Sequence, residues 1–235
     1  MRLDKYLAHA LNISRSDVKK ILKSKQVTIE GQVVKDGKYQ LDNQEVFVNG
    51  QLVGYQEYYY YLLHKPKGVI TATKDASQRT VMDLFAKEDY RPDLYPVGRL
   101  DKDTTGLLLI TNDGALGHEL LSPKKHVAKT YLATVAGELT ATGLKQLVAG
   151  IELKNGEQTQ PAQLKVLKAD PKLKASLVEI TIHEGKYHQV KRMFAAIGTR
   201  VVELKRLKMG TLTLPEDLKL GQYIALTADQ VEQLR

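Results

Sequence analysis

The chain has 235 residues, of which 43% are hydrophobic, so it can bury the core of one large domain or of a large and a small one. Its net charge of +8 favours a polyanionic partner, with nucleic acid ahead of an anionic membrane. The absence of cysteine excludes disulfides, thiolate zinc sites and a cysteine nucleophile. No apolar run reaches the roughly 18 residues that span a bilayer, and we recognise no signal segment. We therefore expect a cytoplasmic protein with no membrane partner.

Residues 1–48 predict a small basic domain. Two helices, the second capped by Ser14 or Ser16, precede a hairpin pattern over residues 26–34. The first 30 residues alone have a net charge of +4. The second helix has a basic stripe at i, i+4 and i+8, formed by Arg15, Lys19 and Lys23. A stripe on a lone helix is usually only a solvated face, but in a small basic unit of a basic chain we expect it to bind the phosphate backbone of a nucleic acid.

A polar segment with glycines follows the small domain. We predict a linker over residues 49–57 and a second domain over residues 58–235. The four tyrosines of residues 58–61 could stack on bases, but tyrosine also favours strands and the segment continues into two leucines. We assign these tyrosines to a strand.

The second domain mixes strands and helices without regular alternation. Residues 129–136 and 176–183 alternate like half-buried strands, whereas residues 139–148 and 188–197 have helical spacing. A final helix begins with a capping-box pattern at Thr227. The fold class that this order predicts is α+β, with a mixed, mostly antiparallel sheet.

The loop over residues 97–106 carries the pattern that points most clearly to chemistry. It places Arg99 and Asp101 in a polar segment bounded by glycine that leads into an apolar strand over residues 107–111. Two other segments could converge on it. Residues 129–131 open a strand with a cation and an aromatic, and residues 184–193 form a cationic strand–turn–helix junction.

A lysine of that junction could pair with the loop carboxylate. Lys191 lies at the edge of the buried helix face, so it can reach a partly buried Asp101 and keep it ionised for nucleophilic or general-base work. Asp113 is better explained as a helix N-cap, and His183 with His188 lacks the further ligands of a metal site. Ser122 has no triad pattern around it. The residues alone therefore indicate a nucleic-acid-binding protein with a candidate one-carboxylate active site.

These motifs resemble those of the ribosomal RNA pseudouridine synthases. Residues 98–109 are similar to the central motif of that family, with residues 65–68, 129–131 and 184–193 similar to its branch acting on ribosomal RNA. Residues 2–7 and 14–16 resemble the small RNA-binding domain first described in ribosomal protein S4. The resemblance implies a small α/β RNA-binding domain followed by a catalytic domain that isomerises uridine to pseudouridine, without a cofactor or metal.

The resemblance also implies roles for individual residues. Asp101 would be the catalytic carboxylate acting at the sugar, Tyr131 would stack on the base, and Lys191 would pair with Asp101. Because the target uridine must leave its stack in the RNA, Arg99 would fill the gap left in the RNA helix or contact a phosphate. The residues that we expect to contact RNA are Arg99, Arg15, Lys19, Lys23, Lys129 and Arg192.

Residues 186–193 are most similar to the branch that modifies small-subunit (16S) ribosomal RNA, which implies a target of the uridine 516 type and a monomer bound to this RNA or to the assembling subunit. Two alternatives remain open, namely a large-subunit (23S) RNA synthase of the same family and a non-catalytic ribosome-assembly factor. A DNA-binding regulator is disfavoured, because the chain has no dimer-forming heptads.

Overall fold

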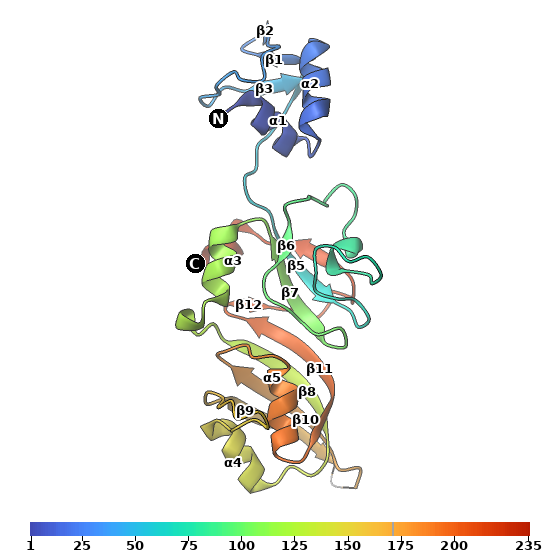
Figure 1. Ribbon diagram of the computed structural model, residues 1–235, viewed down its shortest axis with the longest axis vertical. Coiled ribbons are helices and arrows are strands. Elements are labelled where there is room, and N and C mark those ends of the chain that lie inside the picture. The colour runs from blue at the N-terminus through green and yellow to red at the C-terminus, as the bar shows by residue number, and fades with distance from the viewer. Residues whose placement is uncertain (171) are drawn as a thin grey trace. The chain divides into compact units, whose positions relative to one another are not determined.

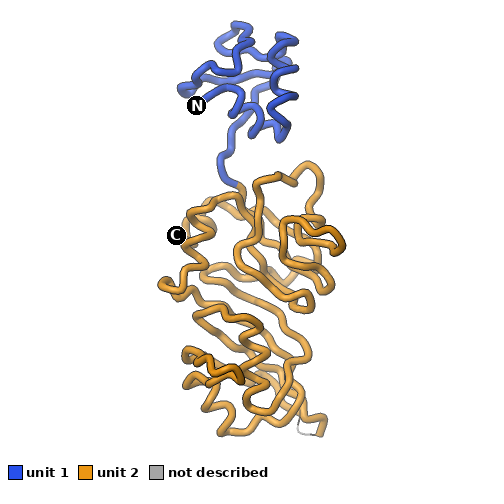
Figure 2. The backbone as a smooth tube through the Cα atoms, viewed as in Figure 1, with its two compact units in different colours: residues 1–58 blue, residues 59–235 orange. Residues whose placement is uncertain are grey.

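The computed structural model describes residues 1–170 and 172–235 (Figure 1). The chain divides into two compact units, residues 1–58 and residues 59–235 (Figure 2). Among the described residues, no helix is both long and apolar enough to cross a membrane.

The first unit packs two helices on a small antiparallel sheet. Ser14 caps the second helix by accepting a hydrogen bond from the Asp17 amide, so the predicted cap is confirmed. The basic stripe on that helix is exposed, while Val18 and Leu22 of its other face are buried in the core. The elements are α1 (Leu3–Ala10), α2 (Arg15–Lys23), β1 (Val27–Ile29), β2 (Gln32–Val33), β3 (Val46–Val48) and β4 (Gln51–Leu52), with strand order β2-β1-β3-β4.

The strands β3 and β4 extend this unit into the segment predicted as a linker. They form a hairpin whose turn is Asn49-Gly50, and both residues have positive φ, 53° and 77°. Asn-Gly is the preferred sequence of a tight hairpin turn because it accepts that backbone conformation. With three and two residues, the strands are too short for alternation to reveal them, so this dipeptide is the signal that the linker interpretation left out.

The second unit is built on one large mixed sheet. Its strand pairs are antiparallel apart from β7 with β11, which is parallel, so within the described residues the predicted sheet type is confirmed. The strand order is β13-β5-β7-β11-β8-β10-β9, with β6 on β7 and β12 on β11. The strands are β5 (Tyr60–Lys65), β6 (Tyr95–Pro96), β7 (Thr105–Thr111), β8 (Lys129–Ala136), β9 (Gln163–Asp170), β10 (Ala175–Ile182), β11 (Arg200–Met209), β12 (Leu212–Thr213) and β13 (Tyr223–Ala225).

Two helices of this unit begin at the caps that the sequence predicts. Asp113 accepts a hydrogen bond from the Leu116 amide at the start of α3, and Thr227 forms the predicted capping box with Gln230. In Figure 1, α5 lies against the strands β8, β10 and β11, into which it buries an apolar face. The helical segments are α3 (Gly114–Leu121), α4 (Ala141–Ala149), α5 (Gln189–Ala196), α6 (Ala228–Glu232) and the 3-10 turns η1 (Val81–Leu84) and η2 (Pro123–Lys125).

The parallel contact between β7 and β11 positions the loop that carries Asp101. Gly106 pairs with Arg206 at a φ of +110°, and a Cβ on Gly106 would lie 2.2 Å from the Arg206 carbonyl oxygen. Only glycine therefore permits this approach. The consequence is that the loop before β7 ends directly beside the middle of β11.

Candidate active site

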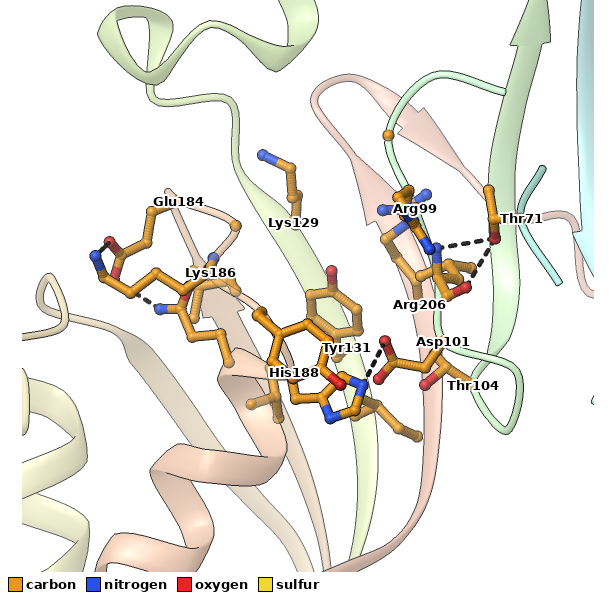
Figure 3. Close-up of a pocket in the computed structure, with 18 of the residues that line it drawn as sticks. Thr71, Arg99, Asp101, Thr104, Lys129, Tyr131, Glu184, Lys186, His188 and Arg206 are labelled. Carbon is orange, nitrogen blue, oxygen red and sulfur yellow. Dashed lines mark hydrogen bonds and ion pairs between the residues drawn. The ribbon is translucent and has the colours of Figure 1, made fainter. Parts of the chain in front are cut away.

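A cavity of about 1020 Å³ lies where the loop before β7 meets β8, β11 and the start of α5. Asp101 and Tyr131 both line it, and Arg99 and Lys129 lie on its walls. Figure 3 shows Asp101, Tyr131 and His188 around one space, although they come from three distant parts of the sequence. Four of the predicted site residues thus meet at one cavity.

The Asp101 carboxylate is held by two basic side chains. Its Oδ2 accepts a hydrogen bond from Lys191 Nζ at 2.9 Å, and its Oδ1 lies 3.2 Å from His188 Nε2. Lys191 also donates to Asp103 Oδ1 at 2.6 Å. Lys191 does not line the cavity, so it contacts the carboxylate from the side that faces away from the cavity. Burial alone would lower the pKa of Lys191, but its hydrogen bonds to Asp103 and Asp101 outweigh that effect and raise this pKa.

We expect Lys191→Met to reduce stability by an amount that does not vary with pH near neutrality. Because the pKa of Lys191 is raised in the folded protein, the stabilisation from its ion pairs is complete at every pH below 10.5, the ordinary pKa of lysine. Because the pKa of Asp103 is lowered, first by its hydrogen bond from Lys191, this stabilisation is also complete above pH 3.8, the ordinary pKa of aspartate. Chemical denaturation of both proteins at several pH values between about 5 and 7.5 checks this. A difference in unfolding free energy that changes steadily across this range would contradict the assignment of charges.

Hydrogen bonds to the backbone fix the loop that presents Asp101. Lys65, at the end of β5, is fully buried, and its Nζ donates to the carbonyl oxygens of Pro66, Asp101 and Thr104, each at 3.0 Å. Burial lowers the pKa of Lys65 to about 8. On the other side, Thr71 Oγ1 donates to the Leu100 carbonyl at 2.7 Å and accepts from the Leu100 amide at 3.1 Å. The carboxylate is therefore carried on a rigid loop.

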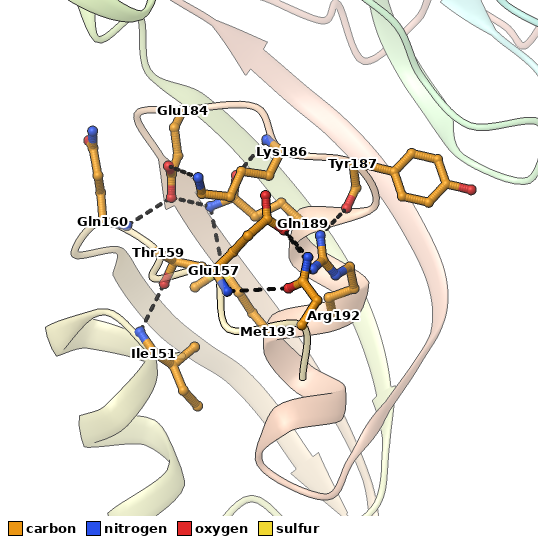
Figure 4. A network of polar contacts seen from close by, with 11 residues as sticks. Ile151, Glu157, Thr159, Gln160, Glu184, Lys186, Tyr187, Gln189, Arg192 and Met193 are labelled. Carbon is orange, nitrogen blue, oxygen red and sulfur yellow. Dashed lines mark hydrogen bonds and ion pairs between the residues drawn. The ribbon is translucent and has the colours of Figure 1, made fainter. Parts of the chain in front are cut away.

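A second network shapes the segment that delivers His188 (Figure 4). Glu184 Oε1 accepts hydrogen bonds from the Gln160 amide at 2.8 Å and from Gln189 Nε2 at 2.7 Å. Gln189 Oε1 in turn accepts from the Lys186 amide at 2.9 Å. His188 takes a left-handed conformation, with a φ of 48°, at the N-cap of α5. That conformation turns the chain so that the imidazole faces Asp101.

Arg192 lies apart from the cavity. Its guanidinium donates to Glu157 Oε2 at 2.7 Å and to the Tyr187 carbonyl at 3.1 Å, and it also contacts Asn155. Figure 4 shows it within this internal network. Because consecutive helix residues point about 100° apart, Arg192 cannot share the direction of Lys191. Its contact with RNA remains a prediction, whereas its internal contacts tie the loop of residues 155–157 to α5.

Sequence reasoning assigned no role to three residues that shape the site. Lys65 and His188 both lie in motifs that carry the family resemblance, but the sequence only argues against a metal site at His188 and indicates a role for neither residue. Arg206, on β11, lines the cavity and is almost completely buried. No spacing signal marks these residues, because their roles depend on which segments the sheet brings together. Among the described residues, no group of three His, Cys, Asp or Glu side chains is placed to hold a metal ion.

The arrangement suits chemistry at an electron-poor carbon. A carboxylate held between a lysine and a histidine can attack such a carbon or stabilise positive charge on it. The neighbouring Tyr131 ring offers an apolar face for a planar ring, and the cavity has the volume of a typical ligand site, about 300–1,000 Å³. The site can therefore hold a planar ring beside one carboxylate.

The chain belongs to the RNA pseudouridylate synthase family, whose model matches residues 59–196, while the model of the S4 domain matches residues 1–47. It is 43% identical to the ribosomal small subunit pseudouridine synthase A of Yersinia pestis, over 98% of this chain and 97% of that protein. It is 42% identical to the ribosomal large subunit pseudouridine synthase B of Bacillus subtilis, over 100% and 95%. A crystal structure of a pseudouridylate synthase matches with a TM-score of 0.70 and 38% identity, over 100% of both chains. The chain is thus a pseudouridine synthase preceded by an S4 domain.

Proposed function

We propose that this protein isomerises a single uridine of small-subunit ribosomal RNA, at a site of the uridine 516 type, acting as a cytoplasmic monomer. The observation that carries the proposal is the Asp101 carboxylate, held by Lys191 at 2.9 Å, in a cavity shared with Tyr131. The chain is 43% identical, over nearly its full length, to a small-subunit synthase, and this similarity supports small-subunit RNA as the substrate. The similar identity to a large-subunit synthase makes large-subunit RNA the second candidate.

In the proposed reaction, Asp101 acts at the sugar carbon C1′ while the bond from C1′ to N1 of uracil breaks. The base then rotates and C5 bonds to C1′, after which the C5 proton leaves and N1 takes up a proton. Atoms and electrons balance without an oxidant or a group donor. Tyr131 supports the uracil ring during rotation, and Lys191 holds Asp101 from behind as a positioning residue.

The proposed substrate is tested by mapping pseudouridine after incubation of the purified protein with unmodified small-subunit and large-subunit ribosomal RNA. Carbodiimide treatment and primer extension report each new pseudouridine as a stop. We expect one new stop, in the small-subunit RNA. A stop in the large-subunit RNA alone would replace the proposed substrate with the second candidate. No stop in either RNA, nor in partly assembled particles, would favour the non-catalytic assembly factor.

We also propose that α2 binds the RNA backbone through its exposed Arg15, Lys19 and Lys23. Substitution of all three by Gln is expected to weaken binding to ribosomal RNA and to lower the slope of log Kd against log salt by about 2, because fewer counterions are released per complex. Filter binding at several salt concentrations measures this slope. Lys35→Gln with Lys38→Gln is the control, since these exposed lysines of the same unit lie outside α2. A triple variant with the wild-type slope would refute the role of α2.

A further inference from the structure

Arg206 is a buried cation that has no counter-ion among the described residues. Its side chain is 2% exposed, and its Nε donates to the Leu107 carbonyl oxygen at 2.7 Å. Within the described part of the chain, Nη2 has no hydrogen-bond partner, and no carboxylate forms an ion pair with the guanidinium. An arginine stays charged at any pH a protein meets, and buried charges are normally paired. Within the described residues, the guanidinium therefore has a backbone acceptor but no counter-ion.

A second cation lies on the same cavity wall. Arg206 pairs in register with Tyr131 of β8, and Lys129 lies two residues before Tyr131, hence on the same face of that strand. Among the described residues, Lys129 donates to the Val127 carbonyl alone, at 2.9 Å. The pKa of Lys129 is lowered mainly by burial and further by the positive charge of Arg206. Both side chains line the cavity that Asp101 shares.

The carboxylates of the cavity are already engaged elsewhere. Asp101 is paired with Lys191 and His188, and Glu184 accepts from the Gln160 amide and the Gln189 side chain. Neither neutralises Arg206 or Lys129. The wall beside Tyr131 therefore carries two partly desolvated positive charges that a bound anion would compensate. A neutral uracil carbonyl would satisfy a donor but would leave both charges in place.

We propose that Arg206 and Lys129 form an anion subsite that binds a phosphate attached to the nucleotide held against Tyr131. The inference rests on the proposed function, because it takes the bound nucleotide as the substrate. The planar guanidinium presents parallel N–H donors that match two phosphate oxygens, and the lysine adds a point charge. The subsite would let the enzyme bind the nucleotide within an RNA chain in preference to a free nucleoside.

The test compares the binding of uridine, uridine 5′-monophosphate and uridine 3′-monophosphate to the full-length protein by isothermal titration calorimetry. We expect at least one monophosphate to bind about tenfold or more tightly than uridine, in line with a charge-assisted contact to a buried cation. Arg206→Gln and Lys129→Gln should each remove most of this preference while leaving the affinity for uridine within a factor of about three. The phosphate position that shows the effect identifies which side of the nucleotide is bound.

Lys208→Gln is the matched control, because Lys208 is an exposed lysine two residues along β11 from Arg206 and does not line the cavity. It should keep the full preference. If Arg206→Gln does not fold, as judged by circular dichroism, Lys129→Gln carries the test. Equal binding of uridine and both monophosphates by the wild type, or an undiminished preference in the variants, would overturn the subsite. Because none of these measurements requires turnover, the subsite can stand where no RNA is modified, and modification can stand where the subsite fails.

Discussion

Asp101→Asn is expected to lower the rate of pseudouridine formation by at least about a thousandfold, which corresponds to about 4 kcal/mol of barrier. Asparagine keeps the shape of the side chain but removes the negative charge that acts at C1′. Lys191 would retain its hydrogen bond to Asp103, so the loop should keep its place. The affinity for RNA should therefore stay within about threefold of wild type, because one neutralised carboxylate adds no phosphate contact. Single-turnover rates and filter binding on the same RNA separate the two effects.

Asp103→Asn is the matched control for that variant. Asp103 also accepts a hydrogen bond from Lys191, but 71% of its side chain is exposed and it does not line the cavity. We expect it to slow the reaction by no more than about tenfold, since exposed ion pairs contribute little. Equal losses in the two variants would mean that the charge of the pair, rather than the position of Asp101, supports the reaction. Retained turnover by the Asp101 variant would remove Asp101 from the catalytic role.

Lys65→Met is expected to destabilise the second unit by about 3 kcal/mol, because three partly or fully buried carbonyl oxygens would lose their donor. For a unit of this size the melting temperature should fall by about 6–12 °C. Activity should fall as well, since two of these carbonyls belong to the loop that carries Asp101. Thermal unfolding followed by circular dichroism measures the first effect. Lys67→Met is the control, because among the described residues the Lys67 ammonium contacts Glu203 alone, in an exposed ion pair, so its loss should change stability little.

The pH dependence of that variant has a definite sign. The pKa of Lys65 falls from 10.5 in the unfolded chain to about 8 in the folded protein, so the unfolded state binds more protons between these values. The stability of the wild type relative to Lys65→Met should therefore increase as pH rises from about 8 to 10.5. A difference that decreases over this range, or a melting temperature within about 2 °C of wild type, would contradict the burial of a charged Lys65.

Local sequence signals predicted the elements, whereas the surroundings of the site depended on long-range packing. Ser14, Asp113 and Thr227 could be recognised as caps because each acts on an amide three residues away. Asp101 and Lys191 are 90 residues apart, and their pairing was suggested by the place of Lys191 on its helix and by the family resemblance.

No local sequence signal identified the two buried cations of the site, Lys65 and Arg206. A lysine that donates to three carbonyls, or a buried arginine with no counter-ion among the described residues, is identified only once the sheet has enclosed it. Lys65 is the last residue of a mostly buried strand, and Arg206 lies in a strand whose pattern is otherwise mixed, with several exposed residues. The parallel contact between β7 and β11, which depends on Gly106, is the feature that places Arg206 at the cavity.

The most direct test of the central claim, that the Asp101 cavity isomerises uridine, is the release of tritium from RNA labelled at C5 of uridine. Formation of the bond from C5 to C1′ expels the hydrogen on C5, so each pseudouridine should release one tritium to water. We predict one equivalent per molecule of small-subunit RNA with the wild-type protein and none above background with Asp101→Asn. Absence of release with the wild type on either ribosomal RNA, or equal release by the two proteins, would contradict the account.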